Sequence, residues 1–186
     1  MPTTNVTANE ARTIYASTGS PNTLRGRAAA TNANVINTGN TGLLVSFFQH
    51  TLFNVYVNYR SFLNFDLSSL SGTVTGVSIT LKRHDSLDYP DFFFVASEAG
   101  DSLALTDYLD GIVGASSYPF TSDATKFIDS AHSPDDGGSD GDTITINLNS
   151  AAVSHANSVI GSGKFKMAII NAHDFNDTYD DDDDGF

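Results

Sequence analysis

The chain has 186 residues, 40% of them apolar, which is enough to bury the core of one domain. Lysine and arginine number 9 against 22 acidic residues, which gives a formal net charge of −13. This charge argues against sequence-independent binding to nucleic acid, which needs cations to neutralise phosphates, and against docking on anionic lipid. The lack of cysteine excludes a disulfide framework, thiol catalysis and zinc bound by cysteine.

No run of residues approaches the roughly 20 apolar residues of a membrane span, so no membrane insertion is expected. The first residues, Met1-Pro2-Thr3, lack the basic and apolar stretches of an export signal, and none is expected there. Of the acids, 20 are aspartate and 2 are glutamate. Aspartate favours caps, turns and oxygen-rich metal loops, so this composition is typical of short strands joined by polar loops.

Alternation of apolar and polar residues, the pattern of half-buried strands, dominates the chain. In chain order it predicts strands at residues 13–16, 33–36, 43–48, 53–59, 63–67, 77–81, 92–95, 144–148 and 165–169. The second of these is either a weak strand or part of a long loop. In the fifth, Leu63, Phe65 and Leu67 are expected to share one buried face.

Two helical segments interrupt the strands. Residues 102–113 place leucine and isoleucine on one helical face, and residues 150–160 form the clearer helix. Asn149 or Ser150 can cap the second helix, and Gly161 lies where a helix ends. His155 is offset from the apolar stripe of this helix and is expected to face solvent.

These elements predict an all-β protein, an antiparallel jelly-roll-like β-sandwich with one or two short helices. A parallel α/β fold would need a helix after nearly every strand. Residues 1–186 are expected to form a single domain, with a core at 10–175 and an acidic C-terminal segment at 174–186. Such a sandwich normally closes with one more strand, so either the chain is truncated or its last strand comes earlier.

Residues 60–70, Arg-Ser-Phe-Leu-Asn-Phe-Asp-Leu-Ser-Ser-Leu, and the strand at 74–81 resemble the DNRLRE domain family. This family is similar in fold to family 6 carbohydrate-binding modules. Residues 145–153 and 165–171 resemble its later strand-into-helix element and the strand that follows, whereas Gly76-Val77 departs from the common Ser-Ala. The resemblance implies a non-catalytic β-sandwich, often supported by calcium, of the kind found in surface adhesins, beside polysaccharide-degrading enzymes and in phage structural proteins.

Seven of the last 13 residues are aspartate, a density that costs repulsion unless the carboxylates are solvated or bind a cation. Carboxylate oxygens suit calcium, and the spacing from residue 180 to Gly185 matches the opening half of a calcium loop, without its closing glutamate. The predicted calcium ligands are Asp174, Asp177, Asp180, Asp182 and Asp184. A solvated acidic tail is the alternative.

The sequence offers two further candidate ligand sites. The aspartates at 135, 136, 140 and 142 form either a second metal site or a glycine-rich surface loop. Tyr89 and Tyr118, each followed by proline in a predicted loop, are the candidate sugar-binding residues, with rim tyrosines as the alternative. Arg60 is expected to pair with an aspartate across strands rather than bind ligand.

No catalytic motif is present, and the acids cluster in polar loops rather than in apolar pockets, so the chain is not expected to be an enzyme. Two functions remain. The first is a bacteriophage virion component (a decoration, tail or fibre protein) on the virion exterior, which associates with itself or with other virion proteins. The second is a calcium-supported carbohydrate-binding module or adhesin domain of a larger secreted protein, located outside the cell or on its surface and binding a glycan.

Overall fold

The computed structural model describes residues 4–18, 33–36, 46–50, 55–82, 90–104, 106–114, 124–133, 139, 141–176 and 178. Within these residues the chain forms eight strands and three short helices. The strands are β1 (Glu10–Thr18), β2 (Ala33–Ile36), β3 (Ser46–His50), β4 (Val55–Asp66), β5 (Ser78–Lys82), β6 (Phe92–Ala96), β7 (Thr143–Asn147) and β8 (Lys164–Asn171). The helices are α3 (Asp107–Asp110), α4 (Ser150–Val159) and α5 (Ala172–Asn176).

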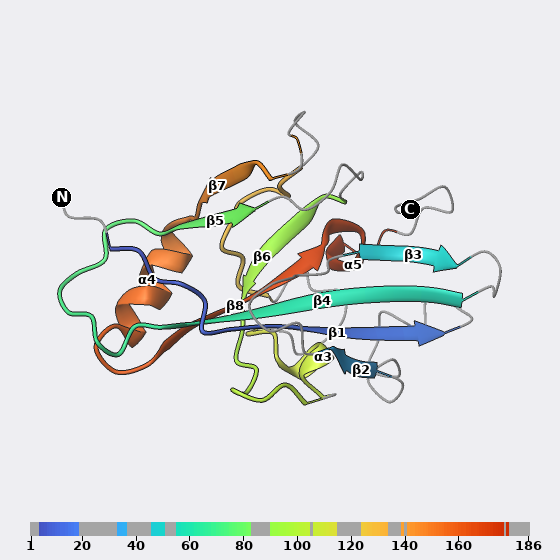
Figure 1. The fold of residues 1–186 in the computed structure, drawn as a ribbon, viewed down its shortest axis with the longest axis horizontal. Helices are drawn as coiled ribbons and strands as arrows, with labels where there is room; N and C mark the ends of the chain where they lie inside the picture. The colour runs from blue at the N-terminus through green and yellow to red at the C-terminus, as the bar shows by residue number, and fades with distance from the viewer. Residues whose placement is uncertain are drawn as a thin grey trace.

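The larger sheet has six strands in the order β2-β1-β4-β8-β6, with β3 also paired to β4. β1 runs along one edge of β4, whereas the other edge of β4 pairs first with β3 and then, from Arg60, with β8. Figure 1 shows β4 as the longest strand, with β1 beside it. The two strands predicted at 53–59 and 63–67 are therefore one strand, because residues 60–62 contain no turn-forming glycine or proline.

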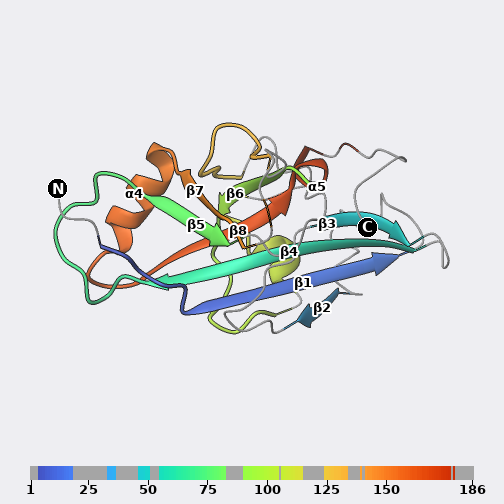
Figure 2. The same cartoon turned by 45° about the horizontal axis from the view of Figure 1, so that its top comes forward.

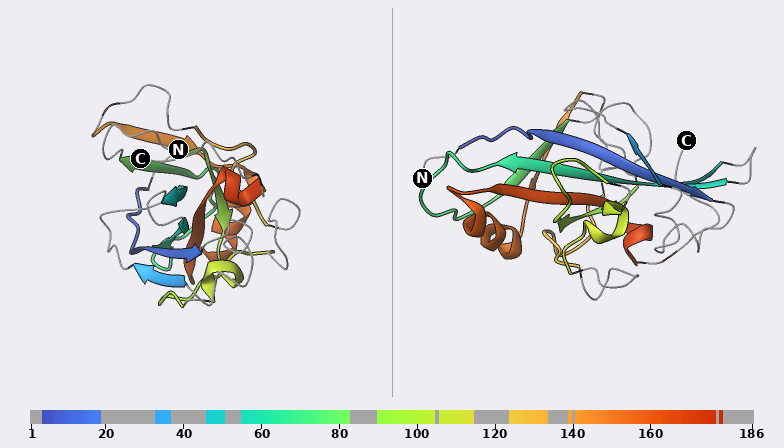
Figure 3. Two further views of the ribbon diagram at one scale, coloured as in Figure 1. Left: turned by 90° about the vertical axis from the view of Figure 1, so that its right-hand side faces the viewer. Right: turned by 90° about the horizontal axis from the view of Figure 1, so that it is seen from below.

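The smaller sheet consists of β5 and β7, paired from Ser78↔Asn147 to Lys82↔Thr143. These strands lie side by side near α4 (Figure 2) and apart from the strands of the larger sheet (Figure 3, left). Ile79 and Ile146 are buried, while their outward neighbours Thr80 and Thr145 are exposed. Every strand pair in the described residues is antiparallel, which confirms the all-β prediction.

Both faces of the larger sheet are covered around β6, all five residues of which are buried and apolar. On one face Phe165 lies opposite Phe65 in the register and stacks on Phe127 at 5.2 Å between ring centroids. On the other face Phe93 packs against Phe175 of α5 at 4.4 Å. This explains why Phe62 is as buried as Leu63, while the predicted buried face is confirmed for Leu63 and Leu67, and Phe65 is partly buried.

Helix α4 agrees with its prediction. The Asn149 side chain accepts hydrogen bonds from the first turn, and Gly161 adopts a φ of 76°, the left-handed conformation that commonly follows a helix. The helix predicted at 102–113 is reduced to the four residues of α3, because Ile112 forms a bridge to Ser97 and draws the chain to the sheet edge. The short helix α5 was not expected. None of the helices in the described residues has the length and hydropathy that crossing a membrane requires.

Candidate functional site

A buried ion pair joins the centre of the large sheet to helix α5. Arg60 on β4 donates from Nε to Asp174 Oδ2 at 2.7 Å and from Nη2 to Asp174 Oδ1 at 2.8 Å. Both side chains have no exposed surface. This two-bond geometry is the strongest arrangement available to an arginine and a carboxylate.

Tyr108 of α3 closes the other side of this pair. Its ring centroid lies 3.9 Å from the Arg60 guanidinium carbon, and its backbone carbonyl accepts from Arg60 Nη1. The Tyr108 hydroxyl accepts from Asn58 Nδ2 at 2.8 Å. Asn171 caps α5, because its side-chain oxygen accepts from the backbone N–H of His173 at 2.7 Å. The cluster thus ties β4, α3 and α5 together.

Asp174, one of the predicted calcium ligands, pairs with the Arg60 guanidinium in this structure. Both of its oxygens accept from Arg60, which bears out the expectation that Arg60 pairs with an aspartate, although from a helix and not across strands. The other predicted calcium ligands, Asp177, Asp180, Asp182 and Asp184, and the predicted sugar-binding Tyr89 and Tyr118, lie outside the described residues. Among the described residues, no three histidines or acids gather as a metal site would require.

His155 is not the solvent-facing residue that the helical pattern predicted. Its ring lies 5.6 Å from that of Phe127 and 5.3 Å from that of Phe165, between centroids. Its Nε2 is buried without a hydrogen-bond partner. Burial lowers the pKa of His155 below its ordinary value of 6.5, because the imidazolium would lose solvation there.

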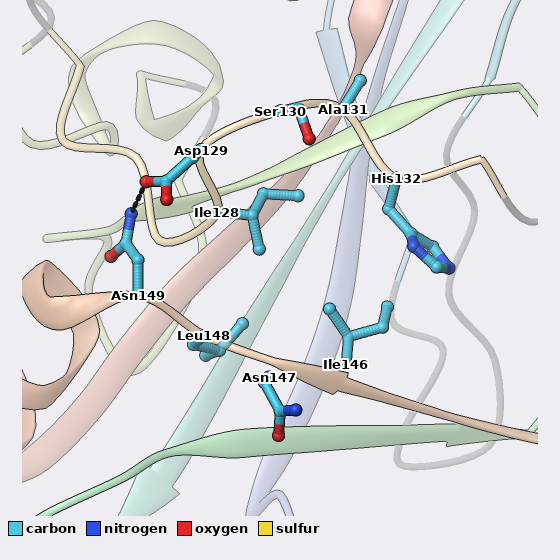
Figure 4. Close-up of a pocket in the computed structure, with 9 residues that line it drawn as sticks. All are labelled: Ile128, Asp129, Ser130, Ala131, His132, Ile146, Asn147, Leu148 and Asn149. Carbon is cyan, nitrogen blue, oxygen red and sulfur yellow. Dashed lines mark hydrogen bonds between the residues drawn. The ribbon is translucent and has the colours of Figure 1, made fainter.

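A hollow of about 380 Å³ lies between two chain segments, residues 128–132 and 146–149 (Figure 4). This volume is at the lower end of the roughly 300–1,000 Å³ of small-molecule sites. Its apolar lining includes Ile128, Ile146 and Leu148, each less than a tenth exposed. Its polar lining includes the exposed side chains of Asp129 and Asn147.

The rim of this hollow is fixed by the cap of α4. Asn149 Nδ2 donates to Asp129 Oδ1 at 2.8 Å, as the dashed line in Figure 4 marks, and to the Lys126 carbonyl at 3.2 Å. Asn149 Oδ1 accepts from Ala151 N–H at 3.0 Å. One side chain therefore orients the helix, the 126–129 segment and the carboxylate at the rim. Sequence reasoning identified Asn149 as a cap but missed the hollow, which depends on segments some 20 residues apart.

Comparison with known proteins finds no family that the chain matches, and no curated protein or solved structure that is significantly similar to it. The resemblance to DNRLRE domains remains an expectation from the residues that carry it.

Proposed function

We propose that this chain is a non-catalytic structural or adhesive protein that folds as a jelly-roll-like β-sandwich and acts by packing against neighbouring subunits. Within that class we propose a bacteriophage virion component on the particle exterior, in a decoration, tail or fibre role. Calcium bound by the acidic C-terminal segment is part of the same proposal.

The outer face of the β5–β7 sheet carries this proposal. Its outward side chains form three cross-strand pairs, Ser78 with Asn147, Thr80 with Thr145, and Lys82 with Thr143, and all six residues are exposed. The hydroxyl oxygens of Thr80 and Thr145 lie 3.1 Å apart, so the two strands hold these side chains in register.

No acidic residue lies on this face, although the chain as a whole carries a net charge of −13. Two copies of so acidic a protein repel each other over most of their surfaces. A face of hydroxyl and amide groups with one lysine and no carboxylate is therefore a surface on which neighbouring subunits can pack with little charge repulsion.

The buried Arg60–Asp174 pair also supports a structural role. Both charged groups are fully enclosed, and each satisfies the other, so neither reaches a ligand at the surface. The pair joins α5 to the sheet and so contributes to a rigid subunit.

The test is the solution mass of the chain by light scattering, with calcium and then with chelator. A defined oligomer or polymer supports the proposal, and its loss on chelation together with a lower melting temperature would place calcium at the contact. A monomer in both conditions would contradict it and favour the carbohydrate-binding alternative, which a glycan array would then examine.

A matched pair of variants locates the contact. Thr145→Asp places a carboxylate on the β5–β7 face and is expected to disperse the assembly. Thr125→Asp makes the same change at an exposed position outside this sheet and should leave the assembly unchanged. Equal assembly of both variants would remove the β5–β7 face from the contact.

A further inference from the structure

Within the part of the chain that the structure describes, strand β7 pairs along one of its edges, with β5. The N–H of Leu148 donates to the Val77 carbonyl at 2.9 Å, and Ile79 lies opposite Ile146 in the register. Hydrogen-bonded and non-bonded residue pairs alternate in an antiparallel ladder. Ile146 therefore bonds to β5, whereas the backbone N–H and C=O groups of Thr145 and Asn147 point to the opposite edge.

This opposite edge borders the hollow. Two residues beyond Asn147, the N–H of Asn149 on the same edge donates to the Phe127 carbonyl at 2.8 Å. The N–H of Phe127 donates to the Phe94 carbonyl of β6, also at 2.8 Å, so Phe127 links the large sheet to the segment that follows β7. Residues 128–132 then continue beside β6, where His132 and Phe92 exchange two backbone hydrogen bonds, and the hollow opens between this segment and β7.

Among the described residues, this edge carries none of the sequence features that protect natural strand edges. Such edges usually carry lysine, proline, a bulge or a covering segment, because an open edge pairs with other chains. β7 has the sequence Thr-Ile-Thr-Ile-Asn, without charge or proline, and threonine and isoleucine favour strands. No strand in the described part of the chain pairs with this edge.

We propose that the free edge of β7 receives an extended segment of a neighbouring protein subunit, which adds as a third strand of the small sheet and fills the hollow. The inference rests on the proposed function, because it names a contact through which subunits pack. Backbone hydrogen bonds to Thr145 and Asn147 supply affinity, as in other cases of strand addition.

The chemistry of the hollow defines the incoming segment. Its side chains alternate in direction, and those facing the hollow meet Ile128, Ile146 and Leu148, so these positions take β-branched apolar residues. The alternate positions meet the exposed carboxylate of Asp129 and an acidic protein, so they take lysine or threonine and not acids. The segment matches the five residues of β7 in length.

The experiment measures binding of an end-blocked peptide of alternating lysine and valine to the full chain, by fluorescence anisotropy. The key variant is Asn147→Pro, which removes an edge N–H that the β5–β7 ladder does not use, a position where proline is tolerated. Its matched control is Asn5→Pro, which makes the same substitution at an exposed residue outside both sheets. We expect Asn147→Pro to weaken binding roughly ten-fold and Asn5→Pro to leave it unchanged.

Two further arms keep the test decisive if the proline variant fails to fold. Asp129→Lys reverses the charge at the rim of the hollow. It is expected to weaken binding of the lysine–valine peptide and to strengthen binding of a glutamate–valine peptide. A lysine–valine peptide with N-methylated backbone cannot form the ladder, and it is expected not to bind.

Three results would overturn the inference. The first is that the peptide does not bind at about millimolar concentration. The second is that the methylated peptide binds as tightly as the unmethylated one. The third is that a neutral disaccharide that binds the same residues displaces the peptide. Light scattering separates the two proposals. If the Asn147→Pro chain assembles like the wild type, the β7 contact is refuted and the proposed self-assembly stands. If the wild-type chain is a monomer that binds the peptide through this edge, the proposed self-assembly is refuted and the β7 contact stands.

Discussion

An arginine in the middle of a sheet is expensive to bury unless its charge is paired and its N–H groups are satisfied. Arg60 meets this condition through Asp174, the Tyr108 carbonyl and the Tyr108 ring. The pair lies between residues 114 positions apart in the chain. Its main effect is to fix which part of the C-terminal region packs on the sheet.

Asp174→Asn tests this directly. The variant leaves the Arg60 guanidinium buried without a counter-charge, and we expect it to lower the free energy of unfolding by about 3–5 kcal/mol. The matched control is Asp101→Asn, whose side chain is 59% exposed in its ion pair with Lys164, so little change is expected. Urea denaturation measures both. Equal effects of the two variants would mean that the buried pair contributes no more than a surface one.

His155 is expected to make the stability of the folded chain depend on pH. Because burial lowers its pKa in the folded state, the unfolded chain binds a proton more readily as the pH falls below about 6.5. The contribution of neutral His155 to stability is therefore present above that pH and is lost progressively below it. Melting temperatures between pH 8 and pH 5 measure the loss, and His155→Leu should flatten the curve while preserving the contact with the two phenylalanine rings. An unchanged pH dependence in this variant would exclude His155 as its source.

The surroundings of single residues could be predicted only in part from the sequence. An arginine within an apolar strand indicates a carboxylate partner, and Arg60 was expected to have one, but pattern alone could not choose among 20 aspartates. His155 was assigned to solvent because it lies off the apolar stripe of its helix. The rings of Phe127 and Phe165 widen the buried face of that helix beyond the stripe.

Elements that depend on local signals were predicted well. Helix α4 has its cap at Asn149 and its terminating Gly161, and its predicted and observed ends differ by one residue. The ends of β4 and α3 depend on distant partners. β4 is continuous because β1 pairs along most of its length, and α3 is short because Ile112 bonds to the edge beyond β6.

Leu63→Ala tests the assignment of the buried face of β4. Leu63 is 4% exposed and lies opposite Met167, so its truncation is expected to cost about 2–5 kcal/mol of unfolding free energy. Leu103→Ala removes the same atoms from a partly buried position and should cost less. Circular dichroism in urea measures both, and a cost below about 0.5 kcal/mol at Leu63 would mean that its side chain is not in the core.

At the scale of the whole molecule, two sheets of unequal size share one core, and Phe127 bonds both to β6 and to Asn149, two residues beyond β7. The antiparallel all-β class follows from alternation and turn residues and was predictable from sequence. The hollow and the free edge of β7 were not. They depend on the register between residues 78 and 147 and on the path of residues 128–132 beside β6, which no local pattern specifies.

The order of the strands also constrains how the protein is made. β8 lies between β4 and β6 in the large sheet, yet it is the last strand in the described chain. During translation β4 and β6 emerge long before the strand that joins them, so the nascent chain holds two apolar strands with unfilled edges until residues 164–171 leave the ribosome. Residues up to 171 must therefore be synthesised before this sheet can close, and during that interval the open edges of β4 and β6 are where a chaperone would protect the chain.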